Sequence, residues 1–176
     1  MKMRDAKGFT LIELLIVVAI IGIIAAIAVP GLLRARMSGN ETSAIGSMRA
    51  VHSAETNYNT NAARNSGYAV DLGVLVDPCP GSTAGFISPD LSTNAVVKSG
   101  YTVTLADGAG AVNGRLDCNG VQSRSAFYAT AAPLTFGSSG NRAFAIDAGG
   151  TVFQETASGT PPPQPLTEAG TISAIN

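Results

Sequence analysis

One carboxylate, Glu13, stands inside an almost entirely apolar run from Phe9 to Val29. A charged side chain within a bilayer-spanning helix costs about 3 kcal/mol even on the lenient insertion scale, so it needs a partner. No other ionisable residue lies in this run. We therefore expect the partner to be another chain, or an amine created by cutting this one. The alternative is a glutamate that is tolerated near the cytoplasmic headgroups.

The two cysteines, Cys79 and Cys118, form a second candidate pair. Both lie after the apolar run, in the part of the chain that we expect outside the cytoplasm. An even number of cysteines in such a location favours a disulfide bond. Together with His52, the lone histidine, they would offer a metal three ligands without tight spacing, whereas structural zinc usually takes four. We expect a disulfide bond between them, and no metal site.

The remaining polar residues do not form a pattern typical of catalysis or cofactor binding. No Ser/His/Asp set, zinc spacing, phosphate loop or dinucleotide fingerprint is present. His52 is expected to be a surface helix residue. The net charge of −1 and the 6% aromatic content give no signal for nucleic acid. Four residues near glycines resemble calcium ligands but fit turns better, because their spacing matches no EF-hand: Asp107, Asp117, Asn119 and Asp147.

The apolar run itself predicts a membrane helix. Residues 9–29 would form a helix of about 30 Å, the thickness of one bilayer core. Lys2, Arg4 and Lys7 precede it, so the N-terminus is expected in the cytoplasm and the rest outside. An ordinary signal peptide would have a shorter core and a small-residue cleavage site, which Ala26 to Ala28 match only weakly. A plain membrane anchor would explain the length but not Glu13.

The segment KGFTLIELLIVVAIIGIIAAIAVP closely resembles the N-terminal signature of type IV pilins and of the pseudopilins of type II secretion. The resemblance implies that a prepilin peptidase cuts after Gly8 and that the new amino terminus, on Phe9, is methylated. It also implies that Glu13 is buried in an assembled filament and that Pro30 kinks the helix. By the same resemblance, the part from Gly22 to Pro30 is expected to unwind locally in the filament.

The resemblance also implies partners and a location. The expected partners are other copies of this chain in a helical filament, the prepilin peptidase and the pilus assembly machinery. The subunit is expected to be a single-pass protein of the bacterial inner membrane before it joins an extracellular filament. The leading interpretation is the structural subunit of a type IV pilus. The alternatives are a pseudopilin of a type II secretion system and, from another class, a membrane-anchored enzyme or binding module.

After the membrane segment, residues 31–65 predict an amphipathic helix. Pro30 lacks an amide hydrogen and is expected to kink or break the helix at that point. An apolar stripe at spacings of three and four is expected to pack on a core: Ile45, Met48, Val51, Ala54 and Tyr58. Charged residues lie largely off the stripe: Arg34, Arg36, Glu41, Arg49 and Arg64.

Residues 66–176 are predicted to form a small antiparallel sheet. Tyr68 to Val76 is expected to be extended or irregular and to lead into a loop around Cys79. Strands are expected at 101–106, 126–130, 143–147 and 151–154, joined by Gly-rich turns. The Pro-rich tail from Ser158 is expected to be extended and to lie on the surface. The predicted division of the chain is a leader, 1–8, a filament-core helix, 9–30, the amphipathic helix and the sheet region. The predicted class is α+β, a pilin fold in which a long N-terminal helix packs on a small antiparallel sheet.

Overall fold

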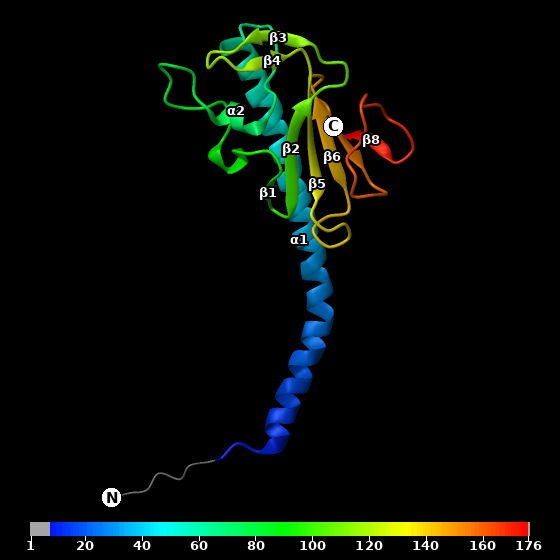
Figure 1. Cartoon of the computed structure of the whole chain (residues 1–176). Coiled ribbons are helices and arrows are strands. Elements are labelled where there is room, and N and C mark those ends of the chain that lie inside the picture. The colour runs from blue at the N-terminus through cyan, green and yellow to red at the C-terminus, as the bar shows by residue number, and fades with distance from the viewer. Residues whose placement is uncertain (1–7, 176) are drawn as a thin grey trace, which may run out of the picture. The chain divides into compact units, whose positions relative to one another are not determined.

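The computed structural model describes residues 8–175, which divide into two units, the first ending at Arg36 and the second beginning at Met37. The residues of the predicted basic N-terminus, Lys2, Arg4 and Lys7, lie outside the described residues. Helix α1 runs from Leu11 to Asn61 and therefore begins in the first unit and ends in the second (Figure 1). It passes through Gly22 and Pro30 without a break, so only a kink, or unwinding on assembly, remains a prediction there.

Helix α1 ends short of the predicted boundary at residue 65. Arg64 and Asn65 have positive φ angles of 52° and 59°, in the left-handed region that a helix does not use. The carbonyl of Gly67 then accepts a hydrogen bond of 2.9 Å from Asn59 on α1. A Cβ on Gly67 would come within 2.6 Å of Ser123 Oγ, so only glycine fits where the chain turns back along the helix.

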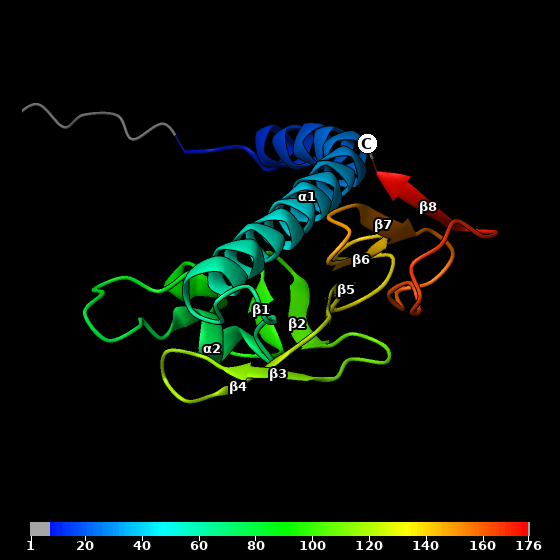
Figure 2. The ribbon, with the colours of Figure 1, turned by 90° about the horizontal axis from the view of Figure 1, so that it is seen from above.

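The second unit is built on a six-stranded antiparallel sheet with the order β1-β2-β5-β6-β7-β8. Its strands are β1 (Val96–Lys98), β2 (Tyr101–Asp107), β5 (Phe127–Pro133), β6 (Ala143–Asp147), β7 (Val152–Glu155) and β8 (Ile172–Ile175). A separate two-stranded hairpin, β3 (Asn113–Leu116) and β4 (Gln122–Arg124), lies in the connection from β2 to β5. The C-terminal part of α1 crosses one face of the sheet, as the view from above shows (Figure 2).

The core lies between this part of α1 and the sheet. On the helix, the predicted stripe is buried from Met48 to Tyr58, and Ile45 is half-buried against the same cluster. On β2 the buried residues alternate, with Tyr101, Val103 and Leu105 facing the helix. The predicted α+β class is therefore confirmed, with one long helix on an antiparallel sheet.

Two parts of the second unit differ from the prediction. Leu72–Val76 forms a short helix, α2, where an extended or irregular connection was expected. Asp71 starts α2 because its carboxylate accepts a hydrogen bond of 3.2 Å from the Val74 amide. The tail was expected only to lie extended on the surface, but Ile172–Ile175 joins the sheet as β8. Upstream in the same tail, Pro162 is buried and its carbonyl accepts a hydrogen bond from Tyr128 of β5.

An acidic residue ties α1 to the loop between β5 and β6. Glu41 was expected off the buried stripe, yet it is only 7% exposed. Its Oε1 accepts the Asn141 amide at 2.8 Å, and its Oε2 accepts Nε and Nη2 of Arg142 at 2.9 and 2.7 Å. This fork-like pairing orients both charged groups, and it explains why a charge is accepted beside the core.

The structure contains the disulfide bond between Cys79 and Cys118, with a Cα–Cα distance of 5.4 Å. It joins the loop after α2 to the turn between β3 and β4. Three further residues, Pro89–Leu91, form a 3-10 turn in the same loop region before β1. The bond therefore connects two excursions of the chain that lie outside the main sheet.

We predict that removing this bond lowers the free energy of unfolding by about 4 kcal/mol, because the bond closes a loop of 39 residues in the unfolded chain. The measurement is denaturant unfolding of the full chain in detergent, comparing oxidised protein with the double variant Cys79→Ser, Cys118→Ser. Equal midpoints for the two would contradict the prediction.

Candidate assembly helix

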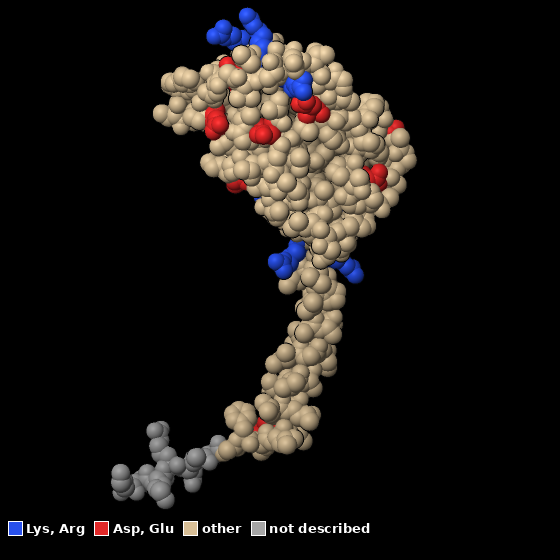
Figure 3. All heavy atoms as spheres, viewed as in Figure 1, with Lys and Arg blue, Asp and Glu red and all other residues tan. Residues whose placement is uncertain are grey.

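The first unit presents an apolar surface on all sides of its helix. Large hydrophobic side chains from Phe9 to Leu33 are 50–88% exposed. Figure 3 shows the helix as uncharged between an acidic group near its start and basic groups at its other end, whereas charged side chains are scattered over the visible face of the second unit. By its length and composition α1 is able to cross a membrane, with a mean hydropathy of 3.1 over its most apolar window. So much exposed apolar surface is not stable in water and indicates a lipid or protein environment.

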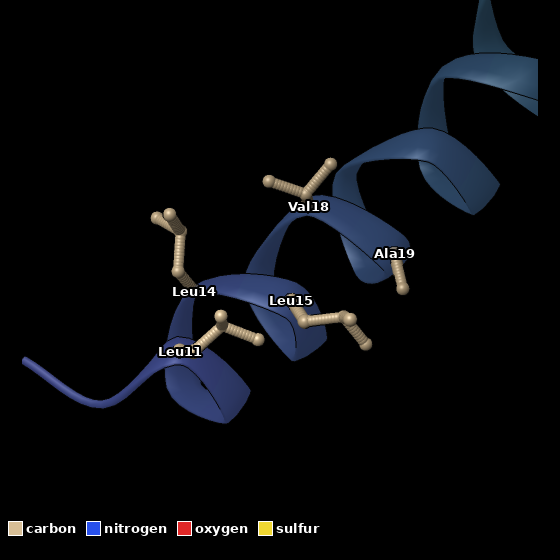
Figure 4. Close-up of a pocket in the computed structure, with 5 residues that line it drawn as sticks. All are labelled: Leu11, Leu14, Leu15, Val18 and Ala19. Atoms are coloured by element: carbon tan, nitrogen blue, oxygen red, sulfur yellow. The ribbon is translucent and has the colours of Figure 1, made fainter.

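One side of this helix carries a row of apolar side chains at helical spacing. Their spacing of three and four residues places them on one face, where they line a shallow apolar hollow: Leu11, Leu14, Leu15, Val18 and Ala19 (Figure 4). Rows at this spacing are the ridges and grooves through which helices pack against one another. The face is therefore suited to contact with another helix or with lipid.

Glu13 forms a capping box with Thr10 at the start of α1. Oε2 of Glu13 accepts hydrogen bonds from the Thr10 amide at 2.9 Å and from the Thr10 hydroxyl at 2.6 Å. In return, the Thr10 hydroxyl accepts the Glu13 amide at 3.2 Å. Each residue thus satisfies a backbone amide that the first helical turn leaves without a partner.

This geometry corrects the expectation that Glu13 has no partner within its own helix. That expectation considered only ionisable groups and overlooked a hydroxyl three residues earlier. Both Thr10 bonds use Oε2, and within residues 8–175 no hydrogen bond reaches Oε1. The carboxylate is therefore half satisfied inside the chain and keeps one oxygen available for another group.

The expected cleavage position lies just before the capping box. Gly8 and Phe9 precede the helix, and Phe9 is 88% exposed. A Cβ on Gly8 would meet no atom within 4 Å, so the fold of this chain does not require glycine there. Gly22 likewise has open space around it within α1.

The other candidate residues serve the fold. The Asp117 carboxylate accepts the amides of Asn119 and Val121, at 2.8 and 2.7 Å, and Asp147 accepts the Gly149 amide at 2.8 Å. Asp107 pairs with Arg124 at 2.9 Å. In residues 8–175 no three His, Cys, Asp or Glu side chains are grouped as metal ligands. The turn interpretation therefore has a structural basis for Asp117 and Asp147, whereas Asp107 is the last residue of β2.

His52 is half-buried rather than fully on the surface. Its ring lies 6.3 Å from that of Phe127, centroid to centroid, and a Cβ on Gly150 would come within 2.9 Å of its Nε2. The sequence prediction also overlooked Glu55, which is completely buried. Its spacing of four from Val51 and three from Tyr58 places it on the buried stripe, and that spacing was visible in the sequence.

Comparison with known proteins agrees with this helix. The prokaryotic N-terminal methylation motif matches residues 3–29. The type IV wide pilus major component PilA4 of Thermus thermophilus is 68% identical over 40 residues, 23% of this chain and 30% of that protein. The type IV narrow pilus major component PilA5 of the same organism is 39% identical over 106 residues, 58% of this chain and 89% of that protein. The chain belongs to the type IV pilin superfamily.

A further relative of this pilin is the type IV major pilin protein PilA of Myxococcus xanthus, 40% identical over 67 residues, 38% of this chain. The matches with PilA4 and with PilA each span about 30% of those proteins' length. No solved structure matches this pilin.

We predict that Thr10→Ala lowers the stability of the first turn of α1 by about 1 kcal/mol, because it removes the N-cap oxygen and one donor to Glu13. Amide hydrogen exchange at Leu11 to Leu14, measured for the full chain in detergent micelles, should become roughly five times faster. Thr10→Ser keeps the hydroxyl and is the control. Unchanged exchange in the alanine variant would rule out the capping role.

Proposed function

We propose that this pilin is the structural subunit of a type IV pilus. Its helix from residue 9 to residue 30 anchors it in the inner membrane, with the N-terminus in the cytoplasm, and later packs against the same helix of other copies in the filament core. The observation on which this depends is the first unit's helix, which is apolar all round, with one carboxylate at its start. The names of PilA4, PilA5 and PilA, all major pilus components, favour a pilus over a secretion pseudopilin.

In this proposal the prepilin peptidase cuts between Gly8 and Phe9 and the new amine on Phe9 is methylated. The exposure of Phe9 and the open space at Gly8 leave this bond accessible. Cleavage creates a cation on Phe9, four residues before Glu13, the last residue of the capping box. In an apolar filament core a cation and a carboxylate both need a partner.

Glu13 supplies that partner through its second oxygen. Oε2 keeps its hydrogen bonds with Thr10, while Oε1 accepts a hydrogen bond from the Phe9 amine of a neighbouring subunit. Such a buried pair adds little net stability, but breaking it by removing one partner costs about 3–5 kcal/mol. Pairing between subunits therefore fixes the register in which one helix stacks on the next.

We predict that the filament subunit begins at Phe9 with a methylated amine. Mass spectrometry of sheared filaments measures the start of the chain directly. Gly8→Val should leave an uncut precursor in the membrane, because a branched side chain does not fit a site matched to glycine. An intact Met1 in sheared filaments, or a start near Val29, would overturn the proposed processing.

We predict that Glu13→Gln and Glu13→Ala both permit membrane insertion and cleavage but reduce filament yield more than tenfold. Glutamine at this position can still complete the capping box, so it separates the charge from the cap. The measurement compares processed subunit in membranes with subunit in sheared fractions. If Glu13→Gln assembles normally while Glu13→Ala does not, the cap suffices and the charge pair must be abandoned.

A further inference from the structure

The second unit contains a carboxyl group that the proposed assembly does not use. Glu55 lies on α1 with none of its surface exposed, among the apolar residues that join the helix to the sheet. A charged carboxylate in such a position is strongly destabilising unless an opposite charge or several hydrogen bonds compensate it.

Glu55 has a single hydrogen-bond partner. Its Oε2 accepts the Ala69 amide at 2.8 Å, and its Oε1 has no partner among the described atoms. Ala69 is itself buried, in the segment between α1 and α2. The neighbouring residue, Tyr68, exchanges two backbone hydrogen bonds with Arg124 of β4, of 2.7 and 3.0 Å. Glu55 therefore holds the helix side of a segment whose other side is bound to β4.

The charged and titratable groups on the surrounding elements have other partners. They are His52 and Tyr58 on α1, Asp71 before α2, Asp117 in the β3–β4 turn and Arg124 on β4. The Tyr58 hydroxyl donates to Asp117 at 2.9 Å, and Asp71 caps α2. Arg124 pairs with Asp107, and His52 packs near Phe127. Within the described chain, no cation bonds to Glu55.

We propose that Glu55 is a proton-binding switch: while neutral it holds the segment before α2 against α1, and when ionised it releases that segment. A neutral carboxyl leaves one oxygen without a partner, which is tolerable. An ionised one leaves a buried charge that one amide cannot compensate, and the side chain moves toward water at the expense of its contact with Ala69.

The direction of the pH effect follows from the burial. Burial raises the pKa of Glu55 from its ordinary value of 4.5 to about 8, and the Ala69 hydrogen bond lowers that pKa by a smaller amount. The folded state therefore keeps a proton that the unfolded chain releases above pH 4.5. The stability from this group is complete below that pH, falls as the pH rises, and is lost above about pH 8.

The test is denaturant unfolding of the full, oxidised chain in non-ionic detergent from pH 5 to pH 9. In the wild type, the ratio of folded to unfolded protein should fall by up to about tenfold per pH unit from this one group. Glu55→Gln should remove that component, and the control Glu168→Gln, at an exposed glutamate, should keep it. The difference between wild type and Glu55→Gln cancels every contribution to the pH dependence that the two proteins share. An identical pH dependence in the two proteins would overturn the proposal.

A second measurement covers the case in which Glu55→Gln does not fold. Carbon-13 NMR of labelled glutamate carboxyls in the wild type should show one group that titrates near pH 8. Over the same range, and after correction for intrinsic rates, the Ala69 amide should lose protection from hydrogen exchange, while the Leu105 amide, bonded to Asn94 at 3.0 Å, keeps it. If every glutamate carboxyl titrates below about pH 6, Glu55 is not the proposed switch.

Discussion

The second unit depends on one contact, the packing of a single stripe of α1 on the inner face of the sheet. Met48, Val51 and Tyr58 belong to the same buried cluster as Tyr101 and Phe144. Burial of side chains of this size stabilises the folded state by about 1.5–3 kcal/mol each. A six-stranded sheet with short strands needs such a covering layer, because an isolated antiparallel sheet leaves one apolar face in water. The same helix is apolar on all sides in the first unit, where its exposed surface requires a lipid or protein environment.

The sequence was informative where apolar residues repeat at a regular spacing over a long segment. The stripe of α1 follows a helical spacing and β2 alternates cleanly, so both were predicted. It was less informative where elements are short or polar. Helix α2 has five residues, too few to show a period, and begins because Asp71 caps it. Strands β3 and β4 have three or four residues and pair only with each other, and β8 is held by pairing with β7, which its own short sequence does not reveal.

The acidic residues were the weakest part of the sequence interpretation, for one physical reason. Glu13 was assigned an ionic partner, Glu41 was placed off the buried stripe and Glu55 was overlooked. All three carboxylates accept hydrogen bonds from uncharged groups. Glu13 bonds to a threonine, Glu55 to a backbone amide, and Glu41 to a backbone amide as well as to Arg142. The Thr10–Glu13 spacing is a known helix start and was recognisable. The Arg142 contact was not, because it joins residues about a hundred positions apart.

Strand β8 has a consequence for the order in which the second unit folds. Residues 172–175 pair with β7 along its whole length, so until they are in place β7 remains an open edge. An open edge is a template for pairing with any other extended chain. The apolar stripe of α1, by contrast, lies more than a hundred residues earlier in the chain than β8. The sheet of the second unit is therefore complete only when residues 172–175, near the end of the chain, have paired with β7.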